Sequence, residues 1–218
     1  MRHLFQPRVL KSASTAALIS TAACYPSLSL WLTRPAPLWY LEFTLFVCAT
    51  VLWGFVFAWH MPYTGQPVLF AKRNAKNYLV ASLAALLLAL AYRFWLDPSL
   101  RKISPDEFPA DLAHWFAAVG FALGVGQLFL TFAPFDWLMR LSRNRWISAG
   151  LTALFGVGVT AMRLQPHVTE IPALALAGQL AGHFIGALLA VIFYLRGGLA
   201  LAYWWAVLFE LRLLPELI

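Results

Sequence analysis

Long apolar segments alternate with short polar segments along almost the whole chain. A window of about 19 residues, the length that crosses a bilayer as a helix, predicts spans near 14–32, 38–60, 78–96, 110–133, 146–163, 171–195 and 198–215. Helix is the expected state because lipid-exposed backbone must be hydrogen-bonded within its own segment, and these runs are too long and continuous for barrel strands. The pattern predicts an all-α polytopic transmembrane bundle of about six to seven spanning helices.

Composition supports this class. The chain of 218 residues is 61% hydrophobic and 11% charged, whereas soluble domains carry about 25% charged residues. Spans of this length leave no room for a separate soluble domain, so we expect one integral membrane domain over residues 1–218. The basic start and the apolar run that follows it are like a signal peptide, but no clear A-x-A cleavage site precedes a polar chain. We therefore expect a retained first span.

The net charge of +7 is distributed as a topology signal. The basic residues lie in short clusters between apolar segments, which argues against nucleic acid as a partner. Ten of the 16 Lys and Arg residues fall on one predicted side of the membrane: Arg2, Arg8, Lys11, Lys72, Arg73, Lys76, Arg140, Arg143, Arg145 and Arg196. By the positive-inside rule that side is cytoplasmic. We expect a cytoplasmic N terminus in a bacterial-type inner membrane.

Small residues and cysteines inside the spans suggest packing rather than chemistry. "GQLAGHFIG" places Gly178, Gly182 and Gly186 on one helical face, where they would let a second helix approach closely. Cys24 and Cys48 have no metal-type spacing and form no disulfide framework. We expect both thiols to be inert packing groups.

Ionisable residues inside the spans are the candidates for function, because each costs roughly 2.5 to 3.5 kcal/mol in hydrocarbon even on lenient scales. His183 and Glu210 lie near the middle of their segments and could pair with each other. Glu42 lies about a turn inside its span and could cap or pair. A further set lies close enough to span ends to extend its polar atoms to the interface: His60, Arg93, His114 and Arg212.

Asp136 allows two interpretations. It lies four residues before Arg140, so the two side chains share a helical face and are expected to form a carboxylate–guanidinium pair at the membrane edge. Alternatively, Asp136, His183 and Glu210 could converge from three helices as a catalytic or metal-binding site. Metal catalysis needs about three such ligands, so zinc is expected only in that case, and no cofactor otherwise.

Residues from about 110 to 215 resemble the core of the CPBP family, the CAAX-protease and bacteriocin-processing intramembrane peptidases. "APFDWLMR" (133–140) stands where the family has E-E-x-x-x-R, and "LFGVGV" (154–159) where it has F-x-x-x-H. "GHFIGALLAVIFYLRGG" (182–198) and "LALAYWWAVLFEL" (199–211) resemble its glycine-rich helix and its last helix. The resemblance divides the chain into N-terminal helices, 1–108, and a CPBP-like core, 109–218.

The chemistry that the resemblance implies does not carry over cleanly. Of the double-glutamate motif, Phe135 replaces the first glutamate and Asp136 the second, and Arg140 matches. The remaining departures are these: Phe155 matches but Val159 replaces the histidine, and Ala206 and Glu210 stand at the positions of H-x-x-x-N. A base that activates water must be a carboxylate or imidazole within reach of that water, and three of the expected groups are missing.

These observations favour a non-catalytic scaffold or partner-binding subunit for another membrane protein, built on a degenerate CPBP-like core. One alternative is an intramembrane peptidase with a rearranged site, with Asp136 or Glu210 as base and His183 as the polarising group. A second is a small-molecule or ion carrier in which His183 and Glu210 line a polar path. Both alternatives stay open at the level of sequence.

Overall fold

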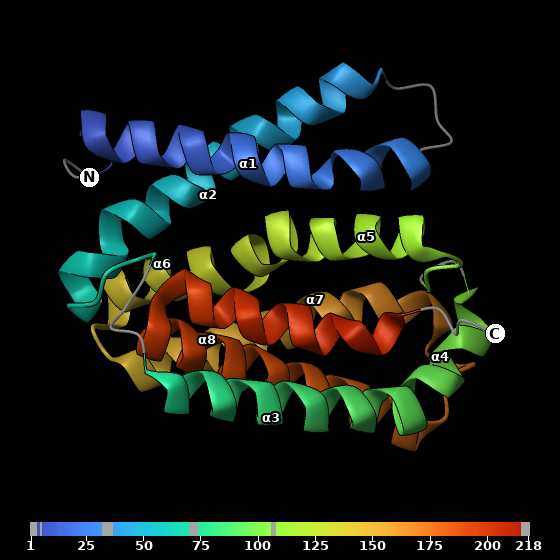
Figure 1. Cartoon of the computed structure of the whole chain (residues 1–218). Helices are drawn as coiled ribbons and strands as arrows, with labels where there is room; N and C mark the ends of the chain where they lie inside the picture. The colour runs from blue at the N-terminus through green and yellow to red at the C-terminus, as the bar shows by residue number, and fades with distance from the viewer. Residues whose placement is uncertain (1–3, 5, 32–36, 70–73, 106–107, 215–218) are drawn as a thin grey trace.

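The computed structural model of the chain describes residue 4 and residues 6–31, 37–69, 74–105 and 108–214. Within these residues the regular elements are helices, and none is a strand. The predicted all-α class is confirmed. Most of the described helices lie roughly parallel or antiparallel to one another, in the manner of a transmembrane bundle, and α2 (Leu38–Thr64) crosses them obliquely (Figure 1).

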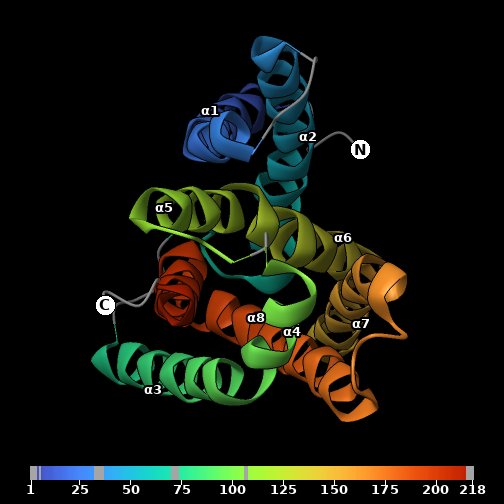
Figure 2. The ribbon, with the colours of Figure 1, turned by 90° about the vertical axis from the view of Figure 1, so that its right-hand side faces the viewer.

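Two N-terminal helices, α1 (Pro7–Trp31) and α2 (Leu38–Thr64), pack together and cover one side of the bundle (Figures 1 and 2). Small residues of α1 allow the close approach, and the indole N–H of Trp53 donates to Ser20 Oγ at 3.0 Å. α1 also packs on α5 (Leu112–Phe121) and on the π-helical segment that follows it, Ala122–Gly126, where a Cβ on Gly124 would come within 2.8 Å of the Ser20 carbonyl oxygen. Small residues on both helices therefore seat α1 on the rest of the molecule.

Two of the long helices contain a π-helical segment that ends two residues before a proline. Residues Tyr92–Leu96 connect α3 (Ala75–Ala91) to α4 (Asp97–Ile103), and Leu128–Phe132 lead into α6 (Ala133–Ser142). A third π segment, Ala122–Gly126, follows α5 in the same helical stretch as Leu128–Phe132. Pro98 and Pro134 each lack an N–H and would clash with the carbonyl four residues earlier, so the preceding turn widens.

The last helices are α7 (Arg145–Leu164) and α8 (Ala173–Glu210). α8 is interrupted at Gly198, which has φ 69° and ψ −165°. A Cβ there would lie within 2.8 Å of the Val68 carbonyl oxygen, and that oxygen accepts the N–H of Leu199 at 2.8 Å. Tyr92 has ring contacts with both His183 and Phe209, so the two arms of α8 fold back on each other. Only glycine fits this reversal.

Five described helical stretches are long and apolar enough to cross a membrane, by length and composition: Leu38–Thr64, Ala75–Ile103, Leu112–Ser142, Arg145–His167 and Ala173–Leu213. The chain is a multi-pass membrane protein. The fifth stretch covers most of both predicted final spans, 171–195 and 198–215, which lie on the two sides of Gly198; residue 215 lies outside the described residues. The predicted first span, 14–32, falls on α1 and on residue 32, which lies outside the described residues; α1 is not among the five.

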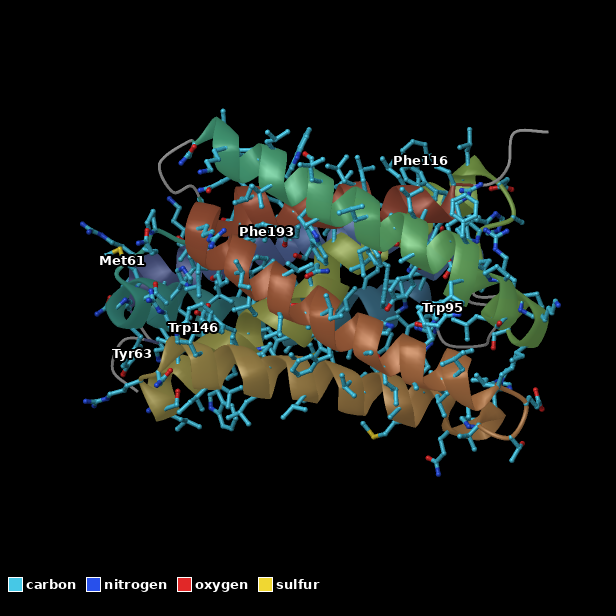
Figure 3. All side chains as sticks on the ribbon, turned by 90° about the horizontal axis from the view of Figure 1, so that it is seen from below. Met61, Tyr63, Trp95, Phe116, Trp146 and Phe193 are labelled. Carbon is cyan, nitrogen blue, oxygen red and sulfur yellow. The ribbon has the colours of Figure 1, made fainter. Side chains whose placement is uncertain are left out.

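The bundle has two distinct ends, which organise the polar residues. The end formed by the C termini of α2 and α6, the start of α7 and the Gly198 turn is called the basic end; its described cations include Lys76, Arg140, Arg143, Arg145 and Arg196. Figure 3 shows Tyr63 and Trp146 there, and Trp95 and Phe116 at the opposite end. α4 and the end of α8 lie at that opposite end (Figure 1).

Candidate functional site

Three side chains from three helices meet inside the bundle near the basic end. His60 of α2 lies with Nδ1 2.8 Å from Oδ1 of Asp136 of α6. The phenol of Tyr194, from the first arm of α8, donates to Oδ2 of Asp136 at 2.9 Å. The His60 and Tyr194 rings are 4.1 Å apart between centroids. His60, Asp136 and Tyr194, here called the three-helix cluster, are each fully buried, with 0% exposure.

Local sequence places each member of the cluster. Pro134 and the π segment before it set the start of α6, and Asp136 lies in the first turn after that segment. Phe132 and Phe135 pack against the Tyr194 ring, with centroids 4.8 and 6.1 Å away. The aromatic surroundings exclude water, so the polar atoms of the cluster depend on one another for hydrogen bonds.

The cluster has the geometry in which a carboxylate orients an imidazole. With Asp136 ionised, Nδ1 of His60 carries the proton, and Nε2 is then an acceptor. Nε2 is buried and has no hydrogen-bond partner among the described residues. Hydrolases use a carboxylate in this way to hold a histidine base. Here, however, the three side chains of the cluster are fully buried, so the imidazole has no exposed surface from which to reach a substrate.

A cavity of about 450 Å³ lies at the basic end, one helical turn or less from every member of the cluster. Tyr63 and Thr64 follow His60 on α2, Met139 follows Asp136 on α6, and Leu195 follows Tyr194. The other residues of the cavity wall come from the end of α2 and the α6–α7 connection: Gln66, Arg143, Asn144, Arg145 and Trp146. The cavity wall therefore carries two cations and no acid.

A second polar group occupies the opposite end. Nη1 of Arg212 donates to both oxygens of Asp97, at 2.8 and 3.0 Å. The guanidinium lies over the rings of Tyr92 and Phe209, 4.7 and 4.5 Å from their centroids. Arg93 donates to the Arg212 carbonyl oxygen at 3.2 Å. These contacts, which we call the Asp97–Arg212 pair, fix the end of α8 to the start of α4.

The predicted catalytic set, Asp136, His183 and Glu210, does not converge. His183 precedes Tyr194 by eleven residues on one continuous arm, which is about 16 Å along the helix axis, and its ring contacts Tyr92. Glu210 is next to Phe209, at the opposite end from Asp136, and its carbonyl oxygen accepts the indole N–H of Trp115 at 3.0 Å. Among the described residues no group of three or more His, Cys, Asp or Glu could hold a metal ion.

The predicted Asp136–Arg140 pair is wrong. Asp136 points into the bundle toward His60, whereas the Arg140 guanidinium stacks over the Trp59 ring, 4.6 Å from its centroid. Spacing along one helix shows which residues share a face, but it does not show that a histidine from another helix competes for the carboxylate. Arg140 keeps a favourable partner through the cation–π contact.

Two residues expected to extend to the interface are instead internal. His60 is completely buried because α2 continues to Thr64, past the predicted end of that span. Arg212 is 14% exposed in its side chain because Asp97 and two aromatic rings enclose it. By contrast, His114 stays near the surface and bonds Asp111 Oδ1 at 2.8 Å.

The predicted packing residues behave unequally. A Cβ on Gly178 would come within 2.7 Å of Leu96 Cδ2, and one on Gly182 within 2.5 Å of the Tyr92 hydroxyl oxygen, so both glycines permit close helix packing. Gly186 has ordinary contacts only, at 3.7 Å or more. Cys24 is buried as expected, but Cys48 is exposed on the outer face of α2, so it is not a packing residue within this chain.

The sequence analysis missed His60 and Tyr194 as partners of Asp136. A histidine two residues before a proline near a span end, in "AWHMP", gave no reason to place it in the interior. Tyr194 has no distinguishing motif in "IFYLR". In comparisons with protein-family models, curated proteins and solved structures, nothing matches the chain.

Proposed function

We propose that this protein is a non-catalytic scaffold that binds another membrane protein, built on a degenerate CPBP-like core in a bacterial-type inner membrane. The observation that supports this is the state of the Asp136 carboxylate, which by the resemblance stands at the second glutamate of the family motif. Both of its oxygens accept hydrogen bonds, from His60 and Tyr194, in a fully buried setting. A carboxylate that activates water must be in contact with that water, and the Asp136 side chain has no exposed surface.

The cluster serves the scaffold by connecting three helices that are distant in sequence. His60 and Asp136 are 76 residues apart, and Asp136 and Tyr194 are 58 apart. A buried polar group is stable only when its partners are present. The cluster therefore favours one arrangement of α2, α6 and α8, and a fixed arrangement of helices is what a partner-binding surface requires.

The same proposal assigns the basic end to the cytoplasm. Lys76, Arg140, Arg143, Arg145 and Arg196 all lie at that end, and such clusters face the cytoplasm under the positive-inside rule. A protease-accessibility or cysteine-labelling assay on intact spheroplasts tests this, with a cysteine introduced by Gln66→Cys as the basic-end reporter and by Glu170→Cys as the opposite-end reporter. The endogenous exposed thiol is removed first by Cys48→Ser. Labelling of the Gln66→Cys protein from outside would contradict the orientation.

The partner is tested by purifying tagged protein from cross-linked membranes and comparing co-purified proteins with an untagged control. We expect a membrane protein enriched in near-equal amount, and still enriched with Asp136→Asn and His60→Gln variants to the extent that they keep the wild-type fold. Equal recovery of all membrane proteins from tagged and untagged cells would contradict partner binding.

A second candidate is an intramembrane peptidase whose base is His60, not His183. It is favoured by one specific observation: His60 Nε2 has no partner while Nδ1 faces a carboxylate. On this proposal Asp136 orients the imidazole and Tyr194 holds Asp136 in place. Its signature is a membrane-protein terminus whose appearance depends on His60 and does not depend on Glu210, because Glu210 lies at the opposite end.

A further inference from the structure

The cavity at the basic end has the chemistry of a site for an anionic group. It offers Arg143 and Arg145, which have no ion-pair partner among the described residues, and no acidic side chain lines it. The Asp136 carboxylate, one helical turn before Met139 of the cavity wall, is hydrogen-bonded to His60 and Tyr194. Guanidinium groups bind phosphate oxygens through charge-assisted and often bidentate hydrogen bonds.

The backbone that carries these two arginines is held in place by local hydrogen bonds. Arg143 ends α6 in the left-handed conformation, with φ 52°, and its N–H donates to the Met139 carbonyl oxygen at 3.0 Å. Asn144 Oδ1 accepts the N–H of Trp146 at 2.9 Å and starts α7. The hydroxyls of Ser142 and Ser148 are 2.8 Å apart across the connection. A site already ordered before binding loses less entropy when its ligand binds.

We propose that this cavity binds the phosphate-bearing headgroup of an anionic glycerophospholipid. Its volume of about 450 Å³ suits a group of that size. The lipid source is argued from position and from the apolar wall. The cavity opens where three spans end, which is the depth of the headgroups, and basic pockets between transmembrane helices bind anionic headgroups.

The apolar part of the cavity wall indicates where the acyl chains leave. Met139 and Leu195 form apolar wall next to the three-helix cluster. Tyr63 and Trp146 lie together at this end of the bundle and are 37% and 62% exposed (Figure 3). Aromatic side chains with a polar atom favour the interface between headgroups and hydrocarbon. A soluble phosphate compound would make no use of these apolar contacts.

The test uses the full-length protein, delipidated in a neutral detergent, with phosphatidylglycerol and phosphatidylcholine of identical acyl chains. Native mass spectrometry gives the bound fraction of each lipid, and the melting temperature reports binding independently. We expect about tenfold tighter binding of phosphatidylglycerol, because the choline cation is repelled by the two guanidinium groups. We expect Arg143→Gln/Arg145→Gln to lower the affinity for phosphatidylglycerol about tenfold.

The matched control is Arg101→Gln/Lys102→Gln, which removes the same charge from exposed residues at the opposite end. It should leave the affinity within about twofold, because a headgroup bound at the cavity is beyond the screening distance of those charges. A second variant, Arg143→Lys/Arg145→Lys, keeps the charge and should keep part of the affinity, which separates binding from folding. Each variant is compared with the wild type in melting temperature without lipid.

Three results would overturn the proposal. An equal loss of affinity in the control variant would show that the lipid is attracted by the net charge of the protein and not by the cavity. Equal binding of the two lipids by the wild-type protein would show that the cavity does not select anionic headgroups. A third arm adds inorganic phosphate or glycerol 3-phosphate: full competition at micromolar concentration would identify a soluble phosphate compound as the ligand instead of a lipid.

Discussion

The Asp97–Arg212 pair and the three-helix cluster are each built on an aspartate placed by the same local structure, but the two aspartates have different surroundings. Asp97 and Asp136 each lie in the first turn of a helix that follows a π segment, and each is within two residues of a proline. At the opposite end Asp97 faces Arg212, which is 14% exposed; near the basic end Asp136 faces His60 and Tyr194, which are fully buried. The local sequence places the carboxylate, and its partners from distant helices decide its chemistry.

The largest expected effect comes from removing the carboxylate of the three-helix cluster. Asp136→Ala leaves His60 Nδ1 and the Tyr194 hydroxyl buried without a partner, so the free energy of unfolding should fall by about 3 kcal/mol. Asp136→Asn keeps the shape and one acceptor, and should cost about half as much. Unfolding in mixed micelles with increasing denaturing detergent measures both. A loss below about 0.5 kcal/mol for Asp136→Ala would contradict the structural role.

The next largest effect is expected at Gly182, which packs against Tyr92, a neighbour of the Asp97–Arg212 pair. Gly182→Ala would place a Cβ 2.5 Å from the Tyr92 hydroxyl oxygen, so Tyr92 must shift, at a cost of about 1 to 3 kcal/mol. The control is Gly158→Ala on α7, where a Cβ would have no neighbour within 4 Å. That change should be neutral or stabilise by up to about 1 kcal/mol through helix propensity. Equal effects of the two changes would argue against close packing at Gly182.

A smaller effect is expected from the Asp97–Arg212 pair. In a double-mutant cycle with Asp97→Asn and Arg212→Gln, the coupling free energy should be about 1 kcal/mol, because the pair lies near the end of the bundle and water can reach part of it. Added salt should reduce this coupling, and it should leave the His60–Asp136 coupling unchanged. An equal reduction of both coupling free energies by salt would contradict the inference that the two groups differ in their access to water.

The smallest effect concerns Asp111, which lies before the first residue of α5 and outside the spans. The Asp111 carboxylate accepts hydrogen bonds from the backbone N–H and the imidazole of His114. These bonds, the backbone bond most of all, hold the pKa of Asp111 below its usual range. The resulting stabilisation is present above the unfolded-state pKa of about 3.9 and is lost as the pH falls through the lower folded-state pKa. Asp111→Ala should therefore lower the melting temperature slightly at pH 7 and leave it unchanged near pH 2.

The helices could be predicted from the sequence because hydrophobic length and the need for internal backbone hydrogen bonds act locally. Four predicted spans, from 38–60 to 146–163, correspond to described helices within a few residues at most ends, although α4 and α6 extend the second and third of these beyond the predicted limits. The reversal at Gly198 was also visible as the break between 195 and 198.

The site was not predictable by the same means, since its members share no spacing. Asp136 was singled out from the sequence, but its bond to His60 depends on how α2 crosses α6, which a hydropathy pattern does not contain. The i, i+4 rule favoured Arg140 instead, because it considers one helix at a time. His183 and Glu210 were singled out because each lies near the middle of its predicted span. A position within one span does not show whether residues of different helices are in contact.

The claim that Asp136 has a structural role is tested most directly by comparing membrane-protein termini in cells by mass spectrometry. The cells lack this protein, carry the wild-type chain, or carry His60→Gln or Asp136→Asn at matched abundance. The account predicts that no terminus depends on either side chain. A terminus that appears with the wild-type protein and disappears with His60→Gln would contradict it, and would assign His60 as the base of an intramembrane peptidase.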